Sequence, residues 1–405
     1  DPKRREEVLT HLRHFGQTPD RLWRERPHPK RFHCSKSSWS SVPLAPLLLA
    51  LASEPLLELE LTQEFVARWP VRSLSLGRSG AILALPHNAI LLNHSQLVLE
   101  WGHLDGSLRV FSMDCARSRS HAPPAPKGPL GSLHGLHQSA TISCACLSSC
   151  GSSLVTADAE GGVAVWELAH QGTLPKLALR GRLGAHSSVV THLACSGAQQ
   201  LLASVSKDGL LLLWCLRRLL LVHVLQVAPK EALGEGAHRG RVVTGLQVRD
   251  SNGEIFVSTP TQVQMWSPNG ALIAVSTVHV SPVLCMSLTP SPEWMAELHP
   301  VIATGHQDGS VRWWLVREPE SLPTLCKGLP FARSHVPVNG TLQPPLELAE
   351  LWQNRLQVAR REPLTSLFLN DGEKPLLLVG DASGAVWACR TPTLVSADVI
   401  DKEYS

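Results

Sequence analysis

The segment Ser204-Val-Ser-Lys-Asp208-Gly209-Leu-Leu-Leu-Leu-Trp214 decides the fold. It combines an apolar stretch, a tight Asp-Gly turn and a second apolar stretch that ends in tryptophan, which is the pattern of a β-hairpin. The same pattern, with a glycine five residues before its terminal position, ends at four other residues: Phe111, Trp166, Trp314 and Cys389. A further copy without that glycine ends at Trp266. The chain is therefore built from repeats.

The terminal positions of these repeats lie 48 to 75 residues apart. A period of about 40–45 residues with tryptophan endings is typical of WD40 repeats, each of which forms one four-stranded blade of a β-propeller. We therefore predict an all-β WD40 β-propeller over residues 69–405, closed with help from the tail after residue 391. Seven blades are expected, with six as the alternative, because residues 71–111 hold more short strands than one blade needs. Proline-rich insertions at about 114–136 and 318–348 account for the extra length.

A histidine precedes the deciding segment at a fixed distance, because His186 lies 28 residues before Trp214. In WD40 blades a histidine, a serine or threonine, a turn aspartate and the tryptophan form a buried hydrogen-bonded chain, and His186, Ser204, Asp208 and Trp214 fill these four places. The other copies are degraded, with Glu160 in the acidic place of one of them. A Ser/His/Asp trio also suits a hydrolase, but this spacing within one blade favours a structural tetrad. We expect no catalytic residue and no enzyme.

Composition excludes several other functions. Of the 405 residues, 43% are hydrophobic, so the chain can bury a core, and a net charge of +3 is too small to indicate nucleic-acid binding. The longest apolar run, residues 43–52, is about half the ~20 residues that a membrane-spanning helix needs. Ten cysteines occur without a CxxC pair, and no glycine-rich phosphate loop is present. We therefore expect no metal, no cofactor and no membrane insertion.

The first residues differ from the repeats. Asp1 and Pro2 suit the start of a helix, and apolar residues then recur at helical spacing. These apolar residues are Val8, Leu12 and Phe15. Residues 1–31 are therefore expected to be the helical C-terminal end of a preceding domain, with a linker over residues 32–68.

Residues 1–31 resemble the final helix and exit segment of a BEACH domain, in the segments Asp1–Val8, Phe15–Leu22 and Pro27–Arg31. In BEACH–WD40 proteins a WD40 propeller follows that domain directly. Within this family the propeller resembles the Alfy-like group of WD repeat- and FYVE domain-containing proteins. The segments that carry this likeness are Asn252–Gly270, Val301–Trp314, Glu347–Arg355 and Leu377–Gly384. Because no cysteine pairs follow Cys389, the chain is most similar to the FYVE-lacking member of the group.

This resemblance implies a non-catalytic protein-interaction scaffold in endosomal and autophagic vesicle trafficking, with antigen cross-presentation in immune cells as one expected role. The protein would be cytoplasmic and peripherally associated with endosomal and autophagic membranes. Its partners would be proteins on the propeller rim and the chain's own BEACH domain. The alternative is a generic cytosolic WD40 adaptor, such as a substrate receptor of a ubiquitin ligase.

Two further predictions concern the surface of the propeller. Lys207 and His306 stand next to blade turns and are expected to line the rim, where propellers bind peptides. Arg217 and Arg218 are flanked by leucines. They indicate either the start of the next outer strand, which we favour, or a surface that faces a partner.

Overall fold

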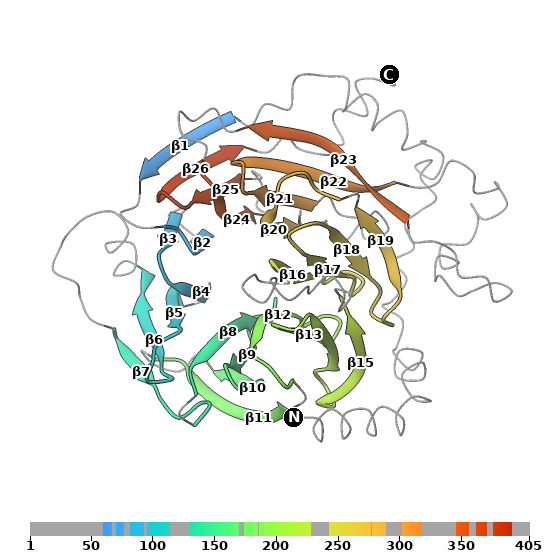
Figure 1. Cartoon of the computed structure of the whole chain (residues 1–405). Helices are drawn as coiled ribbons and strands as arrows, with labels where there is room; N and C mark the ends of the chain where they lie inside the picture. The colour runs from blue at the N-terminus through green and yellow to red at the C-terminus, as the bar shows by residue number, and fades with distance from the viewer. Residues whose placement is uncertain are drawn as a thin grey trace, which may run out of the picture.

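The computed structural model describes most of the repeat region and none of the first 59 residues. The described residues are 60–66, 70–76, 82–92, 95–113, 129–138, 140–169, 174–184, 186–227, 243–276, 278–288, 302–317, 346–355, 362–370 and 376–390. All regular elements within them are β-strands, and they form a ring of sheets (Figure 1). The prediction of an all-β propeller is confirmed. The helix predicted within residues 1–31 lies outside the described residues.

Six four-stranded sheets, which we call blades I to VI, follow one another around the ring. Blade I holds β4 (Asn88–Leu92), β5 (Leu97–Trp101), β6 (Leu108–Ser112) and β7 (Gly131–Leu133). Blade II holds β8 (Ile142–Leu147), β9 (Ser153–Asp158), β10 (Gly162–Ala169) and β11 (Lys176–Gly184). Blade III holds β12 (Val190–Ser196), β13 (Leu201–Ser206), β14 (Leu210–Cys215) and β15 (Leu220–Gln226).

The other three blades complete the ring. Blade IV holds β16 (Gly245–Val248), β17 (Ile255–Ser258), β18 (Val263–Trp266) and β19 (Leu272–Ser276). Blade V holds β20 (Val283–Leu288), β21 (Ile302–His306), β22 (Ser310–Arg317) and β23 (Leu346–Arg355). Blade VI holds β24 (Leu364–Asn370), β25 (Leu376–Asp381), β26 (Ala385–Arg390) and, as its outer strand, β1 (Glu60–Val66).

The stretch that suggested a seventh blade forms only a two-stranded sheet, so the described residues make six blades. Strands β2 (Ser73–Leu76) and β3 (Ile82–Leu85) pair with each other and with no other described strand. Successive side chains of β3 point to opposite faces, as in any strand. Ile82 therefore packs against blade VI, while Leu83 packs against blade I. Two strands of four residues fill the gap between these blades and cannot form a four-stranded blade of their own.

The ring is closed by the first described strand. β1 runs antiparallel to β26, from Glu60 opposite Arg390 to Val66 opposite Ala385, so the two ends of the repeat region lie side by side (Figure 1). The range assigned to a linker, residues 32–68, therefore contains a strand of the propeller. The tail after residue 391, which the sequence suggested as the closing segment, lies outside the described residues.

Blades IV and V are joined at their outer edges. β19 pairs in parallel with β23 at Ala274–Ser276, which makes one eight-stranded sheet of the two blades. β23 begins within the range predicted as the second insertion, and β7 lies within the first. The outer strands of blades I and V are therefore drawn from stretches that the sequence suggested as loops.

The core lies between neighbouring blades, because each blade buries both of its faces. In β10, Ala164 and Trp166 belong to an apolar cluster shared with blade I, whereas Val163 and Val165 belong to one shared with blade III. This alternation with period two gives a run of apolar residues rather than the polar and apolar alternation of a one-sided sheet. It explains why the third strand of each repeat is so apolar.

The glycines of the repeats share one backbone conformation, which explains their fixed position. Gly106, Gly161, Gly209, Gly309 and Gly384 all adopt positive φ, between 66° and 94°, in the turn before the third strand of a blade. A side chain is strained in this conformation. At Gly161 the space is also closed, because a Cβ would lie 2.5 Å from the carbonyl oxygen of His186. The fixed glycine spacing is therefore a requirement of the turn.

Ring closure by β1 can be tested by truncation. A fragment of residues 57–405 should show cooperative thermal unfolding, whereas a fragment of residues 68–405, which lacks β1, should unfold at a lower temperature and aggregate more readily. The reason is that β26 would then expose an unpaired edge. Differential scanning fluorimetry and light scattering on both fragments measure this, and equal unfolding temperatures would contradict the closure.

Candidate functional site

Blade II contains a complete buried hydrogen-bond chain. Trp166 donates its Nε1–H to Thr156 Oγ1 at 2.8 Å, and Thr156 Oγ1 lies 2.7 Å from Nε2 of His137. The other ring nitrogen of His137, Nδ1, lies 2.8 Å from Oδ2 of Asp158. Because the Asp158 carboxylate can only accept, Nδ1 of His137 is the donor, and Nε2 accepts the proton of the Thr156 hydroxyl. His137 then carries its proton on Nδ1 and donates it to Asp158.

The acid in this chain is not the one that the sequence suggested. Glu160 is exposed in the turn, and Asp158 at the end of β9 takes its place. Asp158 and Thr156 are two residues apart on one strand, so both side chains point to the same face. Asp158 also accepts backbone hydrogen bonds from Glu160 at 2.9 Å and Gly162 at 2.7 Å. Burial opposes the charge, but the hydrogen bonds from His137 and Gly162 hold the pKa of Asp158 below its ordinary value.

Blade III contains the tetrad proposed from the sequence, with one link missing. Ser204 Oγ lies 2.7 Å from His186 Nε2 and accepts the Nε1–H of Trp214 at 2.9 Å. Asp208 is exposed and accepts a hydrogen bond from Ser206, while Nδ1 of His186 has no hydrogen-bond partner among the described residues. The structure thus brings together His186, Ser204 and Trp214, and it does not bond Asp208 to His186.

Blade V builds the same chain from a histidine at a different place in the repeat. Trp314 donates its Nε1–H to Thr304 Oγ1 at 2.8 Å, and Thr304 Oγ1 lies 2.8 Å from His306 Nε2. His306 Nδ1 lies 2.8 Å from the carbonyl oxygen of Ser281, to which it donates. His306 is fully buried, so the prediction that it lines the rim is wrong. It ends β21 as Asp158 ends β9, and this position faces the blade interior.

A second histidine stacks on this chain. The ring of His279 lies 4.3 Å from the ring of Trp314 and 5.4 Å from that of His306, measured between centroids. His279 Nε2 lies 2.8 Å from Ser276 Oγ. Nothing in the sequence pattern singled out His279, because its distance from Trp314 differs from the 28 residues between His186 and Trp214.

Burial keeps these imidazoles neutral. Burial lowers the pKa of His186 to about 4, and the nearby charge of Asp208 opposes this only in part. Burial, together with His306 and the charge of Arg312, lowers the pKa of His279 to about 3. The pKa of His306 is also lowered, chiefly by burial. A neutral ring is what the chains require, because Nε2 must accept a proton from the hydroxyl.

The blade-end positions are equivalent in the structure. All six lie on the third strand of a blade: Phe111 on β6, Trp166 on β10, Trp214 on β14, Trp266 on β18, Trp314 on β22 and Cys389 on β26. Phe111, Trp166, Trp214 and Trp314 are buried, and Trp266 is half-buried and donates its Nε1–H to Gln264. Cys389 pairs through its backbone with Leu61 and Leu377. His238, which lies 28 residues before Trp266 as His186 does before Trp214, is outside the described residues.

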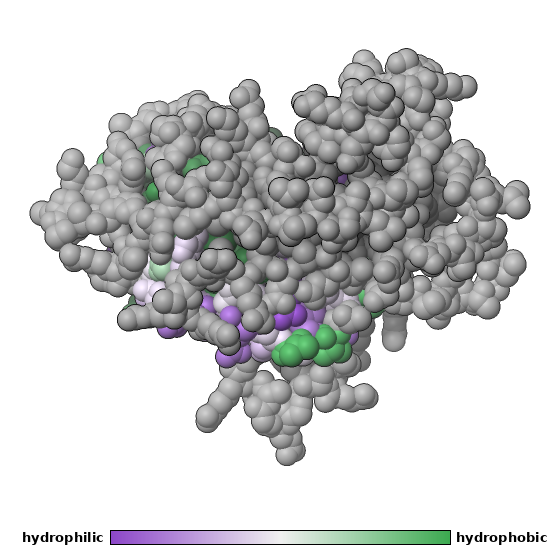
Figure 2. All heavy atoms as spheres, turned by 90° about the horizontal axis from the view of Figure 1, so that it is seen from above, coloured by the Kyte–Doolittle hydropathy of each residue, from purple (hydrophilic) through white to green (hydrophobic). Residues whose placement is uncertain are grey.

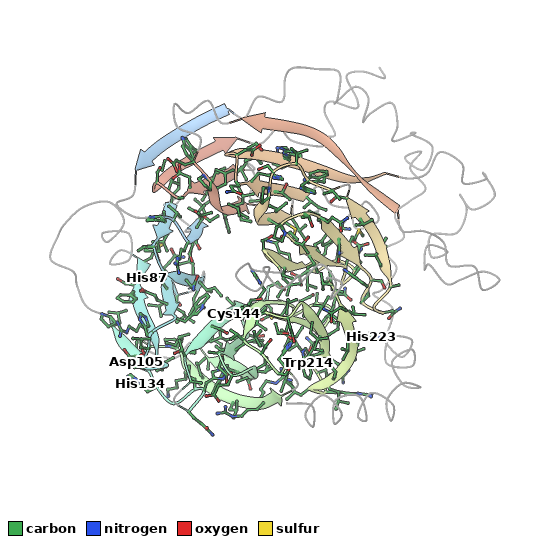
Figure 3. All side chains as sticks on the ribbon, viewed as in Figure 1. His87, Asp105, His134, Cys144, Trp214 and His223 are labelled. Atoms are coloured by element: carbon green, nitrogen blue, oxygen red, sulfur yellow. The ribbon has the colours of Figure 1, made fainter. Side chains whose placement is uncertain are left out.

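Three basic residues that the sequence suggested as surface positions are exposed, unlike the side chains of the buried hydrogen-bond chains. Lys207 is exposed in the turn between β13 and β14, as a rim residue should be. Arg217 and Arg218 are also exposed, in the turn before the outer strand β15. In Figure 3, Trp214 lies inside its blade, whereas His134 lies at the outside of the ring.

The hydroxyls of Thr156, Ser204 and Thr304 are fully buried beneath the blade surface, each between an indole and an imidazole. No three side chains of the histidine, cysteine, aspartate or glutamate type cluster as metal ligands in the described part of the chain. Within the same residues no helix has the length and apolar character to span a membrane.

The acids of blades II and III should differ in importance for stability. Asp158→Ala leaves Nδ1 of His137 buried without an acceptor and should lower the free energy of unfolding by about 1–3 kcal/mol. Asp208→Ala removes an exposed turn carboxylate and should cost about 0.5 kcal/mol or less. Chemical denaturation of both variants measures the difference, and equal losses would contradict the assigned chains.

Acid should destabilise the propeller through its neutral histidines. The folded-state pKa of His186, about 4, and that of His279, about 3, lie below the ordinary value of 6.5, so the unfolded state binds more protons between these values. The free energy of unfolding should therefore fall as the pH drops below about 6.5, by up to about 1.4 kcal/mol per pH unit for each histidine. His279→Phe keeps a ring against Trp314 and should reduce this slope. Denaturant titrations from pH 7.5 to 5 test it, and an unchanged slope would exclude His279.

Comparison with known families identifies the repeat. The family described as "WD domain, G-beta repeat" matches residues 178–215 and 270–314. The first match covers β11 to β14 and the second covers β19 to β22, including the endings at Trp214 and Trp314. Two solved structures share the fold. A chain of the mitotic checkpoint complex has a TM-score of 0.54 at 14% identity, covering 84% of this chain and 94% of that one. The WD40 propeller of Doa1 has a TM-score of 0.51 at 15% identity, with 82% and 97% covered.

Relatives extend over nearly the whole chain. Protein SPIRRIG of Arabidopsis thaliana is 27% identical over 97% of this chain, and BEACH domain-containing protein A2 of the same plant is 28% identical over 97%. Human WD repeat- and FYVE domain-containing protein 4 is 26% identical over 96%. The chain spans only 10–12% of the length of these relatives. Over nearly its whole length the chain is similar to proteins whose names include BEACH domain-containing and WD repeat-containing members.

Proposed function

We propose that this propeller is a non-catalytic protein-interaction scaffold in endosomal and autophagic vesicle trafficking. The observation that carries the proposal is the burial of the serine, threonine and histidine chains of blades II, III and V. Their hydroxyls and imidazoles hydrogen-bond one another, so the groups that would suit hydrolysis hold the blades together. The groups left on the outside are turns, loops and strand edges, and such surfaces bind other proteins.

The place of action follows from the relatives. Human lysosomal-trafficking regulator is 27% identical over 54% of this chain, and its name describes a role in membrane traffic. By analogy, the protein would be cytoplasmic and peripherally associated with endosomal and autophagic membranes. A role in antigen cross-presentation in immune cells is the finer proposal, and it rests on the likeness to WD repeat- and FYVE domain-containing protein 4. Residues 1–31 are proposed to be the end of the BEACH domain, against which they would pack.

The surface supports protein contacts rather than membrane insertion. Figure 2 shows hydrophobic and hydrophilic patches side by side on the part of the described surface that it displays. Val278 and Val280 are 68% and 94% exposed between β19 and β20 and leave two apolar side chains on the surface. A generic cytosolic adaptor, for example in a ubiquitin ligase, is the alternative. The coverage by BEACH relatives favours the trafficking role.

Removing the propeller tests the proposal. In cells that lack the endogenous protein, the full-length protein should distribute to endosomal and autophagic membranes. A version without residues 60–390 should lose most of this association in membrane fractionation, because its partners would no longer be bound. Retention of the full membrane fraction without the propeller would contradict the scaffold.

A second arm separates protein partners from lipids. Residues 57–405 should not sediment with phosphatidylcholine vesicles at physiological salt, with or without phosphatidylinositol 3-phosphate. Binding that follows the phosphoinositide would assign recruitment to lipid and overturn the protein-scaffold proposal. Binding that is salt-sensitive and appears only when residues 1–56 are restored would place the contact in the basic N-terminal segment.

A further inference from the structure

We propose that the outer strand of blade II binds an extended, acidic and apolar segment of a partner protein, which adds to β11 as a fifth strand. This inference rests on the proposed scaffold role and names one of its docking sites and the chemistry of its partner. Three observations converge on this strand: a backbone edge without a partner strand among the described residues, a row of cations without a described ion pair, and an adjoining groove lined in part by leucines.

The backbone edge of β11 is open over an unusual length. β11 has nine residues and pairs with β10, and no other strand of the described residues pairs with it. Of the other outer strands, β7 has three residues, β19 and β23 pair with each other, and β1 and β15 have open edges of seven residues each in the described part of the chain. An unpaired strand edge presents N–H and C=O groups in a row, which an extended peptide can satisfy by adding alongside.

The charge of this edge is of one sign. Lys176, Arg180 and Arg182 are all exposed, β11 contains no acidic residue, and none of the three forms an ion pair with a described residue. Arg182 donates to the carbonyl oxygen of Leu136 at 3.0 Å, and Arg180 donates to that of Leu216 at 3.3 Å. These single hydrogen bonds hold the guanidinium groups in place on both sides of the strand and leave further N–H groups for a carboxylate.

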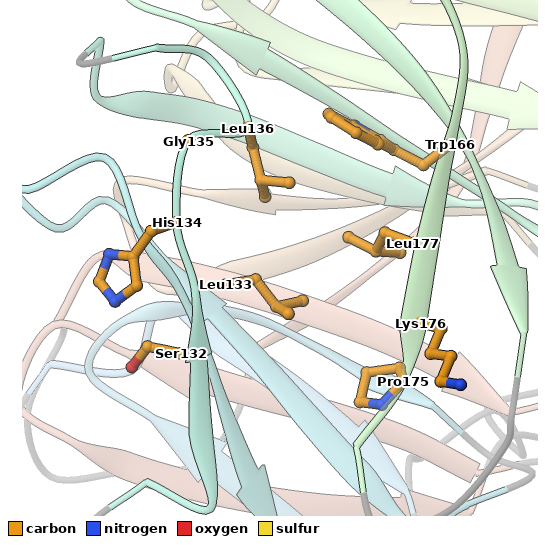
Figure 4. A pocket seen from close by; sticks show the side chains of 9 residues that line it. All are labelled: Ser132, Leu133, His134, Gly135, Leu136, Trp166, Pro175, Lys176 and Leu177. Atoms are coloured by element: carbon orange, nitrogen blue, oxygen red, sulfur yellow. The ribbon is translucent and has the colours of Figure 1, made fainter.

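A groove lined in part by leucines lies beside the start of β11. It has a volume of about 570 Å³ and lies between β7 with the segment that follows it and the start of β11. Figure 4 shows Leu133 and Leu136 directed toward Leu177 across the groove, with Trp166 at its inner side. Leu179, further along the same face of β11, is 48% exposed. Ser132, His134 and Lys176 also line the groove, so its walls combine aliphatic and polar side chains.

These features determine the sequence character of the occupant. Alternate side chains of an added strand point to opposite faces of the blade. On one face they would enter the groove near Leu177 and Leu179, which favours leucine or valine, with an acid toward Arg182. A register shift of β11 against β10 at Arg180 places Arg182 on the groove face and leaves Lys176 and Arg180 on the other face, which favours aspartate or glutamate there. Glu167 of β10 lies on this second face, opposite Ala178, and leaves the groove face free of carboxylates from β10.

A peptide suits this surface better than a membrane does. The open edge offers directional backbone hydrogen bonds, which lipids cannot match, and the apolar residues line a groove rather than project from a flat face. The cations flank that groove at the strand and do not form a broad basic plane. A negatively charged bilayer is therefore an outcome to be excluded by the test.

The test measures binding of a fluorescent eight-residue peptide that alternates leucine or valine with glutamate or aspartate to the 405-residue chain. Fluorescence anisotropy should show saturable binding at moderate salt. The double variant Arg180→Glu with Arg182→Glu should weaken binding by about tenfold or more. Lys207→Glu removes an exposed cation on another blade and should change the affinity less than about twofold. Thermal unfolding of each variant confirms that it is folded.

Two control peptides separate the parts of the proposal. A peptide with lysine in place of each acid should not bind, because it would meet three cations. A peptide with N-methyl groups on alternate amides keeps its charges and loses the backbone donors, and it should bind at least about tenfold more weakly. Absence of binding, or binding that ignores the arginine variants or the N-methyl groups, would overturn the proposal. Binding of phosphatidylserine vesicles that depends on both arginines, without peptide binding, would assign the surface to a membrane instead.

The cellular assay distinguishes failure of this site from failure of the scaffold role. If the double arginine variant keeps normal membrane association while removal of residues 60–390 abolishes it, the scaffold stands and this groove is rejected as its docking site. If neither change affects the association, the scaffold role itself is contradicted. If the double arginine variant and the removal of residues 60–390 both abolish membrane association, and the peptide binds as expected, the results support the site at β11.

Discussion

Backbone pairing between β1 and β26 joins the two ends of the repeat region, and every blade depends on this closure. A blade of this propeller is apolar on both faces, as β10 shows with Trp166 turned to blade I and Val165 turned to blade III. Such a sheet is stable only between two neighbours, so an open ring would leave a bare face at each end. The hairpin β2–β3 serves the same need, because it fills the space between blades VI and I with side chains on both of its faces.

Three buried hydrogen-bond chains have the same first three groups and differ in the acceptor of the histidine Nδ1 proton. In blades II, III and V a tryptophan donates to a hydroxyl that contacts Nε2 of a histidine. The Nδ1 proton then goes to the Asp158 carboxylate in blade II and to the Ser281 carbonyl in blade V, and it has no described acceptor in blade III. What the fold preserves is the contact of the indole, the hydroxyl and Nε2 of the imidazole in the interior, and the final acceptor varies. This is why substitutions of Asp158 and of Asp208 differ in their expected cost.

Because the interior of the propeller is rigid, we expect its functional surfaces to lie on the outside of the ring. Because buried polar chains and shared apolar faces hold adjacent blades together, the ring offers fixed surfaces rather than a moving active site. Blade II illustrates the division of roles: its inward residues form the most complete polar chain, while its outer strand carries Lys176, Arg180 and Arg182 beside a groove lined in part by leucines. The chain spans about a tenth of the length of its relatives, so such surfaces would act as part of a much larger protein.

Local sequence determined the repeat, the turns and the strand that carries each blade-end residue. The glycines must adopt positive φ, and the tryptophans recur at a fixed distance from them, so both signals lie within one hairpin. The link from His186 to Ser204 and Trp214 also follows from spacing within a blade. Tertiary structure alone decided the number of blades, the closing role of β1, and the positions of Asp158 and His306 in their chains. These depend on contacts between segments far apart in the chain, such as Glu60 with Arg390, and on which side of a strand faces a neighbouring blade. A one-residue change of register moves every side chain of a strand to the opposite face. The sequence of a single repeat does not determine that register.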